Sequence, residues 1–126
     1  MKVELTRFRV KPGKSAQVDA WMATLNARMA EVRETLVREH MLVEVIFRET
    51  LNGVEYLSWF SMQGGGGEPV ETSPHDLDRV HLELWRDCID PEFAPQDAMP
   101  EVVMLPEAIV AAMEQYLQTL SGIDGT

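Results

Sequence analysis

Apolar and polar residues alternate along the run from Met41 to Met62, on both sides of the pair Asn52-Gly53. Alternation with a period of two is typical of a β-strand with two different faces. Asn and Gly both tolerate positive φ, which suits them to the type I′ turn that joins paired strands. The pattern therefore predicts one long β-hairpin that folds at Asn52-Gly53.

The turn also predicts the register, with Leu51 opposite Val54. One face of the hairpin then carries a nearly all-apolar set: Val43, Val45, Phe47, Phe60 and Met62. The other face is mixed and carries Glu44, Ile46, Arg48, Leu57 and Trp59. We expect the apolar face to lie under helices, together with Phe8 and Val10. The mixed face should stay open and meet a partner or a ligand.

The rest of the chain alternates between strand-like and helix-like patterns. A strand is predicted over Val3–Val10, and a long amphipathic helix from Ser15 to near His40. A second helix, N-capped by Ser73, should run from Pro74 to about Ile89. A short strand at Glu101–Leu105 should close the sheet.

A last helix over about residues 106–121 follows this core of about residues 1–105, within a single domain of residues 1–126. The order predicts an α+β protein with a ferredoxin-like βαββαβ antiparallel sheet, both main helices on one face, and an extra C-terminal helix.

Composition excludes several classes of partner. The formal charge of −10 argues against a nucleic-acid-binding surface, because such surfaces need clustered Lys and Arg. The one cysteine, Cys88, has no partner for an internal disulfide and is expected to be an inert core thiol. No basic-then-apolar leader or long apolar run is present. We expect a cytoplasmic protein that binds neither nucleic acid nor a membrane.

Four segments carry a family likeness: VELTRFRVKPGK, EVIFRE, EYLSWFS and HDLDRVHLELWRDCIDP. Over roughly the first 105 residues the chain resembles the dimeric α+β-barrel superfamily and is similar to a family of small uncharacterised bacterial proteins. The resemblance implies a homodimer with two sheets packed face to face, and small ligands between sheet and helices or at the interface. Members include cofactor-independent mono-oxygenases, haem-degrading enzymes, isomerases and plain binding proteins, so the fold does not select an activity.

The mixed face is the first candidate site. Arg7, Glu44 and Arg48 are expected beside Ile46, Leu57 and Trp59, with Trp85 at the edge of the apolar stripe of the second helix. Such a set can line a small, mostly apolar pocket with a few charges. It can equally form a dimer interface with internal ion pairs.

His81 is the second candidate. On a helical wheel it lies among Leu77, Leu84 and Cys88, where a general base would be shielded from water. The alternative is a core histidine satisfied by a hydrogen bond. His75 and His81 would lie about 120° apart on their helix, so we expect no metal site there.

Two features near the hairpin have simpler interpretations. His40, at a helix end, suits the helix dipole. The run Gly64–Gly67 lacks the Lys and Ser/Thr of a phosphate-binding loop. It is either a simple connector or a mobile lid over a pocket.

Three functions remain open. The first is a homodimeric binding or accessory protein with a small apolar pocket and no cofactor. The second is a cofactor-independent enzyme, mono-oxygenase-like or isomerase-like, that acts on a small apolar or aromatic molecule with His81 as base and Arg7 or Trp59 positioning the substrate. The third is a haem-binding or metal-binding protein.

Overall fold

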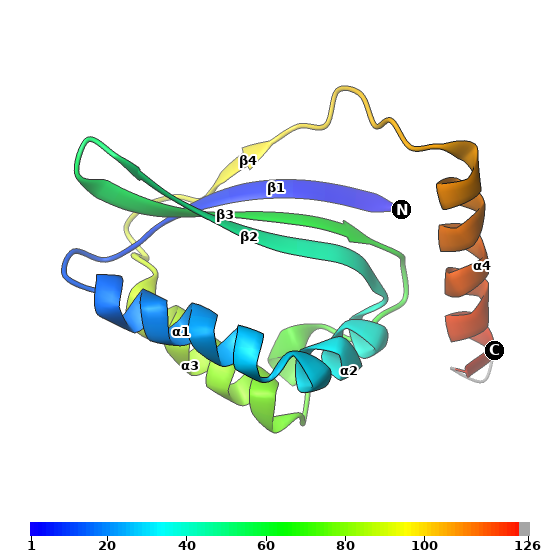
Figure 1. The fold of residues 1–126 in the computed structure, drawn as a ribbon, viewed down its shortest axis with the longest axis horizontal. Coiled ribbons are helices and arrows are strands. Elements are labelled where there is room, and N and C mark those ends of the chain that lie inside the picture. The colour runs from blue at the N-terminus through cyan, green and yellow to red at the C-terminus, as the bar shows by residue number, and fades with distance from the viewer. Residues whose placement is uncertain (124–126) are drawn as a thin grey trace.

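A computed structural model describes residues 1–123, and the side chains of residues 1–121. The described residues form one antiparallel sheet with helices on one side (Figure 1). In chain order the elements are β1 (Lys2–Arg9), α1 (Ser15–Ala27), α2 (Met29–Glu39), β2 (Met41–Leu51), β3 (Val54–Gln63), the 3-10 helix η1 (Val70–Thr72), α3 (Asp76–Cys88), β4 (Gln96–Ala98) and α4 (Glu107–Ile123).

The strands follow the order β2-β3-β1-β4, and every pair in the sheet is antiparallel. Helices α1, α2 and α3 cover one face of the sheet, as Figure 1 shows. The predicted ferredoxin-like α+β fold is therefore confirmed. The extra helix α4 stands beyond one end of the sheet, where Leu117 packs against Gly64. No helix in the described residues is long and apolar enough to cross a membrane.

The hairpin turn is the predicted one. Asn52 and Gly53 have φ angles of 51° and 76°, as a type I′ turn requires. Leu51 lies opposite Val54 and Phe47 opposite Ser58, in the predicted register. An irregularity between Met41 and Val43 shifts the far end, so that Met41 rather than Leu42 lies opposite Gln63.

The sheet faces the helices with its mixed side, opposite to our expectation. Leu57 is fully buried, and Ile46 and Trp59 pack against the same core. Phe47, expected in that core, is 56% exposed on the other face. The deciding contact is between distant strands: β1 pairs with β3 so that Phe8 lies opposite Leu57 and shares its face. The core is completed by Val10, Val18, Trp21, Cys88 and Ile89, with Leu84 and Trp85 against it.

The predicted long helix is two helices, because it breaks at Arg28. The residue has φ −105° and ψ 32°, and neither Gly nor Pro marks the place in the sequence. Its guanidinium binds Glu31 in the next turn and Asp76 of α3. The break lets α2 turn away from the axis of α1, as Figure 1 shows.

Two further boundaries differ from prediction. The closing strand is Gln96–Ala98 rather than Glu101–Leu105, and it pairs with β1. A hydrogen bond of 2.6 Å from Thr6 Oγ1 to Asp97 Oδ1 reinforces this pairing, which no local pattern signals. Helix α3 begins at Asp76, so the N-cap is His75 instead of Ser73.

Candidate functional site

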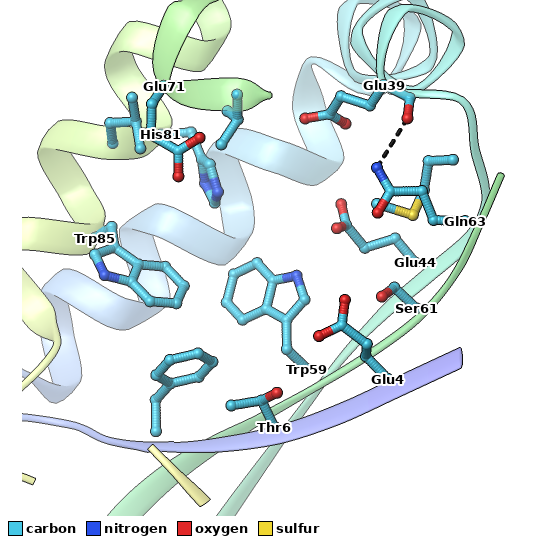
Figure 2. Close-up of a pocket in the computed structure, with 14 residues that line it drawn as sticks. Glu4, Thr6, Glu39, Glu44, Trp59, Ser61, Gln63, Glu71, His81 and Trp85 are labelled. Atoms are coloured by element: carbon cyan, nitrogen blue, oxygen red, sulfur yellow. Dashed lines mark hydrogen bonds between the residues drawn. The ribbon is translucent and has the colours of Figure 1, made fainter. Parts of the chain in front are cut away.

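A cavity of about 370 Å³ lies between the sheet and the ends of the helices that cover it (Figure 2). Alternation along the strands aims side chains from three of them into it. The main lining residues are Glu4 and Thr6 of β1, Glu44 of β2, Trp59, Ser61 and Gln63 of β3, Glu39 at the end of α2, Glu71 of η1, and His81 and Trp85 of α3.

Aromatic rings form one wall of the cavity. Trp59 and Trp85 lie with ring centroids 5.1 Å apart and planes at 61°. Phe8 packs edge-on against Trp85, with centroids 4.5 Å apart. His81 and Trp85 are four residues apart on α3, so both lie on the side of the helix that faces the sheet. The wall can therefore pack against the apolar face of a small ligand.

His81 is held by a residue from another helix. Trp21 Nε1 of α1 donates a hydrogen bond of 3.0 Å to His81 Nδ1. Burial lowers the pKa of His81, and the charge of Asp78 opposes that shift only in part. At neutral pH the imidazole is therefore uncharged.

Two carboxyl groups in the cavity have raised pKa values. Burial, with the nearby charges of Glu44, Asp78 and Glu71, raises the pKa of Glu39 to about 8. Burial also raises the pKa of Glu44, although a hydrogen bond from the Trp59 side chain opposes the shift. Glu44 keeps access to water through the cavity. At neutral pH the cavity thus holds a protonated carboxyl at Glu39.

The run Gly64–Gly67 positions Glu39. A Cβ on Gly67 would lie 2.1 Å from the backbone oxygen of Glu39, so only glycine fits there. The same oxygen accepts a hydrogen bond of 2.8 Å from Gln63 Nε2, the dashed line in Figure 2. Gly64 N donates to the oxygen of His40, and His40 Nδ1 lies 2.8 Å from the oxygen of Gly65. The glycine run is therefore packed closely against the end of α2.

A second cavity of about 290 Å³ adjoins the first and shares Glu39, Glu44, Trp59 and His81 with it. Asp78, which is only 5% exposed, lines this second cavity together with apolar residues of α1 and α2. The four shared residues consequently lie between two cavities, and the first of these has the larger number of polar side chains in its lining.

The structure brings together four of the eight residues proposed from the sequence: Glu44, Trp59, His81 and Trp85. Ile46 lies behind them in the second cavity, and Leu57 is fully buried core. Arg48 binds Glu55 and Asp19, each at 2.5 Å. Arg7 lies on the opposite face of the sheet, where it binds Glu49 at 2.8 Å. Its side chain follows the alternation of β1, which separates it from Thr6 and Phe8.

Sequence reasoning missed Glu4, Glu39, Ser61, Gln63 and Glu71. Ser61 could have been found, because it lies opposite Glu44 in the predicted register. Glu39 and Glu71 follow no strand period, and only the packing of α2 and η1 brings them to the cavity.

Within the described residues, no group of three His, Cys, Asp or Glu side chains could hold a metal ion. His75 is turned away from His81: its Nδ1 accepts from Leu77 N, and its Nε2 lies 3.2 Å from Glu34 Oε2. It acts as the cap of α3.

Comparison of the amino-acid sequence with known families gives a match. A family model described as a family of unknown function, DUF6176, matches residues 1–111. The chain belongs to DUF6176. A search of proteins with curated descriptions found no match to this chain. Among solved structures, an L-rhamnose mutarotase from Formosa agariphila is similar to it, with a TM-score of 0.50 and 14% identity over 85% of this chain and 100% of the mutarotase. Because the sequence identity is only 14%, this likeness shows that the DUF6176 protein has the same fold as the mutarotase, and it shows the fold alone.

Proposed function

We propose that this protein is a cofactor-independent enzyme. It catalyses proton transfers to and from a small, uncharged molecule with several hydroxyl groups, such as a sugar. The observation that carries the proposal is the convergence of Glu39, Glu44 and His81 on one aromatic-walled cavity. The raised pKa values of Glu39 and Glu44 suit these two carboxyl groups to acid–base catalysis near neutral pH, and His81 adds an uncharged polar group beside them. The sequence alone favoured a binding protein with an apolar pocket, but the polar groups of this cavity favour the isomerase-like alternative.

The simplest reaction for such a site is the interconversion of sugar anomers. Glu44, as a carboxylate, takes the proton of the anomeric hydroxyl while Glu39, as a carboxylic acid, gives a proton to the ring oxygen. The bond between the anomeric carbon and the ring oxygen breaks, and an open-chain aldehyde forms. Rotation of the aldehyde and reversal of both proton transfers close the other anomer. No oxidant, metal or cofactor is consumed.

The charge of the cavity supports an uncharged substrate. Among the described residues that line it, four are glutamates and none is Lys or Arg. A phosphorylated or acidic sugar would be repelled, whereas hydroxyl groups can donate to carboxylate oxygens. The L-rhamnose mutarotase shows that this fold can carry such a reaction, while the assignment of the reaction to this chain rests on the cavity.

The test is the rate of anomer exchange for a panel of neutral aldoses, measured by NMR magnetisation transfer in weak buffer. We expect acceleration of at least one aldose, reduced about 100-fold in Glu44→Gln, because general-base catalysis typically contributes 10²–10⁴-fold. Glu101→Gln, an exposed residue outside the cavity, is the matched control and should keep the full rate. Equal rates in Glu44→Gln and the wild type would contradict the proposal, as would the absence of any accelerated aldose.

A second candidate is a binding protein for small organic cations. It is favoured by the glutamates of the cavity other than the protonated Glu39, beside the Trp59–Trp85 wall, because aromatic faces and carboxylates both attract ammonium groups. Titration calorimetry with tetramethylammonium and choline tests it. Heat of binding that disappears in Trp59→Ala, together with no effect on any aldose, would favour this candidate over the enzyme.

We further propose that two copies pair through the sheet face that points away from the helices, here called the open face. It presents Leu5, Val45 and Phe47, which are 41%, 38% and 56% exposed. An exposed apolar strand surface of this kind marks an interface. Light scattering at micromolar concentration should give twice the chain mass, and Phe47→Asp should give the monomer. Val37→Asp, at an apolar residue of α2 that is 41% exposed, should leave the mass unchanged. A monomeric wild type would contradict the pairing.

A further inference from the structure

We infer that Trp21 is a positioning residue that fixes His81 in the tautomer with its proton on Nε2, so that His81 serves the cavity as a hydrogen-bond donor and not as a base. The tautomer concerns the ligand-free protein and stands apart from the reaction. Only the role of His81 in catalysis rests on the proposed function.

The direction of the Trp21–His81 hydrogen bond decides the tautomer. An indole N–H can only donate, so the partner nitrogen, His81 Nδ1, must offer a lone pair. A neutral imidazole with an unprotonated Nδ1 carries its proton on Nε2. Trp21 is itself fully buried and packs against Trp59, tilted at 39°, and against Trp85, edge-on at 79°, with centroid distances of 5.8 and 5.9 Å. The donor therefore cannot swing aside without disturbing the core.

A cationic His81 is opposed by the same contact. Protonation of Nδ1 would turn two N–H groups toward each other, and the N–H of the fully buried Trp21 would be left unsatisfied. Several carboxyl groups line the two cavities that His81 borders, and among them the charge of Asp78 favours the cation. They are Asp78 on its own helix, Glu39 of α2, Glu44 of β2, Glu4 of β1 and Glu71 of η1. Trp21 and burial oppose this field, and Glu39 contributes no charge while it is protonated.

The consequence is a division of roles within the cavity. The imidazole of His81 points into the space between Glu71 and Trp59, as Figure 2 shows. Its free nitrogen, Nε2, presents a proton there, so the ligand atom that meets it must carry a lone pair, as a sugar ring or hydroxyl oxygen does. The general base of the site is then a carboxylate, namely that of Glu44. This replaces the expectation, drawn from the sequence, that His81 is the general base.

Two-dimensional ¹⁵N–¹H correlation spectra of histidine-labelled, ligand-free protein test the tautomer directly. At pH 7 we expect His81 Nδ1 to resonate as an unprotonated, pyridine-like nitrogen and Nε2 as a protonated, pyrrole-like nitrogen. His81→Gln identifies the signals. In the wild type, an Nδ1–H tautomer or an imidazolium at pH 7 would overturn the inference without any variant.

The role of Trp21 is tested by Trp21→Phe, which keeps an aromatic ring and removes the donor. We expect its His81 to show a mixture of both tautomers and a pKa raised by about one pH unit, because a neutral hydrogen bond contributes about 1 kcal/mol. Trp85→Phe is the matched control, since Trp85 contacts the imidazole only through its ring, with centroids 6.4 Å apart. In Trp85→Phe the tautomer of His81 should not change.

If Trp21→Phe keeps the wild-type tautomer and pKa, Trp21 has no positioning role. If the tautomer is as inferred and no aldose exchanges faster, the proposed function fails while this inference stands.

Discussion

Glu39 offers the sharpest test of the cavity's electrostatics, through the change Glu39→Gln. Its pKa rises from an ordinary value of 4.5 to about 8, chiefly because the carboxyl is buried and secondly because other carboxylates lie near. The folded state therefore holds a proton that the unfolded chain has lost. Folding stability from this group is intact below pH 4.5, falls as the pH rises from there, and stops falling near pH 8.

The size of the effect follows from the same two values. One pH unit between them corresponds to about 1.4 kcal/mol, so at pH 7 the upper bound is about 3 kcal/mol. Solvent in the cavity reaches the Glu39 side chain and screens its charge, which reduces the expected loss to about 1–2 kcal/mol. Glutamine has no proton to lose and avoids this loss. Glu39→Gln should therefore be more stable than the wild type by about 1–2 kcal/mol at pH 7 and by less than about 0.5 kcal/mol at pH 5.

Urea unfolding followed by tryptophan fluorescence, repeated between pH 5 and pH 9, measures this difference. The decisive quantity is the change with pH of the stability gap between variant and wild type, because any pH-independent effect of the amide cancels. Glu101→Gln, an exposed residue, controls for the removal of one negative charge and should show no such change. The assigned pKa shift, and with it the acid role of Glu39, would be refuted if the stability difference between Glu39→Gln and the wild type stayed constant across this pH range. A stability difference that became smaller above pH 7 would refute them as well.

Two further predictions concern packing. Leu57→Ala should lower the free energy of unfolding by about 3 kcal/mol, and Phe47→Ala by less than about 1 kcal/mol in the isolated monomer, because only Leu57 is buried. Urea unfolding midpoints at low protein concentration measure both losses. If Phe47→Ala cost more than Leu57→Ala, the sheet would face the helices with its other side. Gly67→Ala should cost more than about 2 kcal/mol, because its Cβ would lie 2.1 Å from the oxygen of Glu39. Gly65→Ala meets nothing within 4 Å and should stay near wild type in the same assay; equal losses at both glycines would contradict the close packing of the loop.

Local chemistry along the chain was enough to determine the hairpin. Asn52 and Gly53 form the predicted turn because both tolerate positive φ, and the turn set the register of the neighbouring strands. The period of α3 placed His81 and Trp85 on one face, and the order of elements determined the ferredoxin-like topology. The turn and the helix face depend on residues within a few positions of one another, whereas the topology follows from the order of the elements along the chain.

Only the tertiary structure decided which face of the hairpin is the core. Both faces carry enough apolar side chains to lie under helices, so the strand pattern alone is ambiguous. The choice depends on the pairing of β1 with β3, which sets Phe8 beside Leu57, and on Trp21 and Trp85, which fill the space above them. These contacts join segments far apart in the sequence.

The candidate site was decided in the same way. Glu39 reaches the cavity because the helix breaks at Arg28 and because Gly67 lets the following loop close on the end of α2. Trp21 meets His81 across sixty positions of sequence through a single hydrogen bond, on which the proposed donor role of the histidine rests. The sequence by itself determined which residue types were available on each element. Packing between distant elements determined which of them share one cavity, and burial in that packing raises the pKa of Glu39 to about 8.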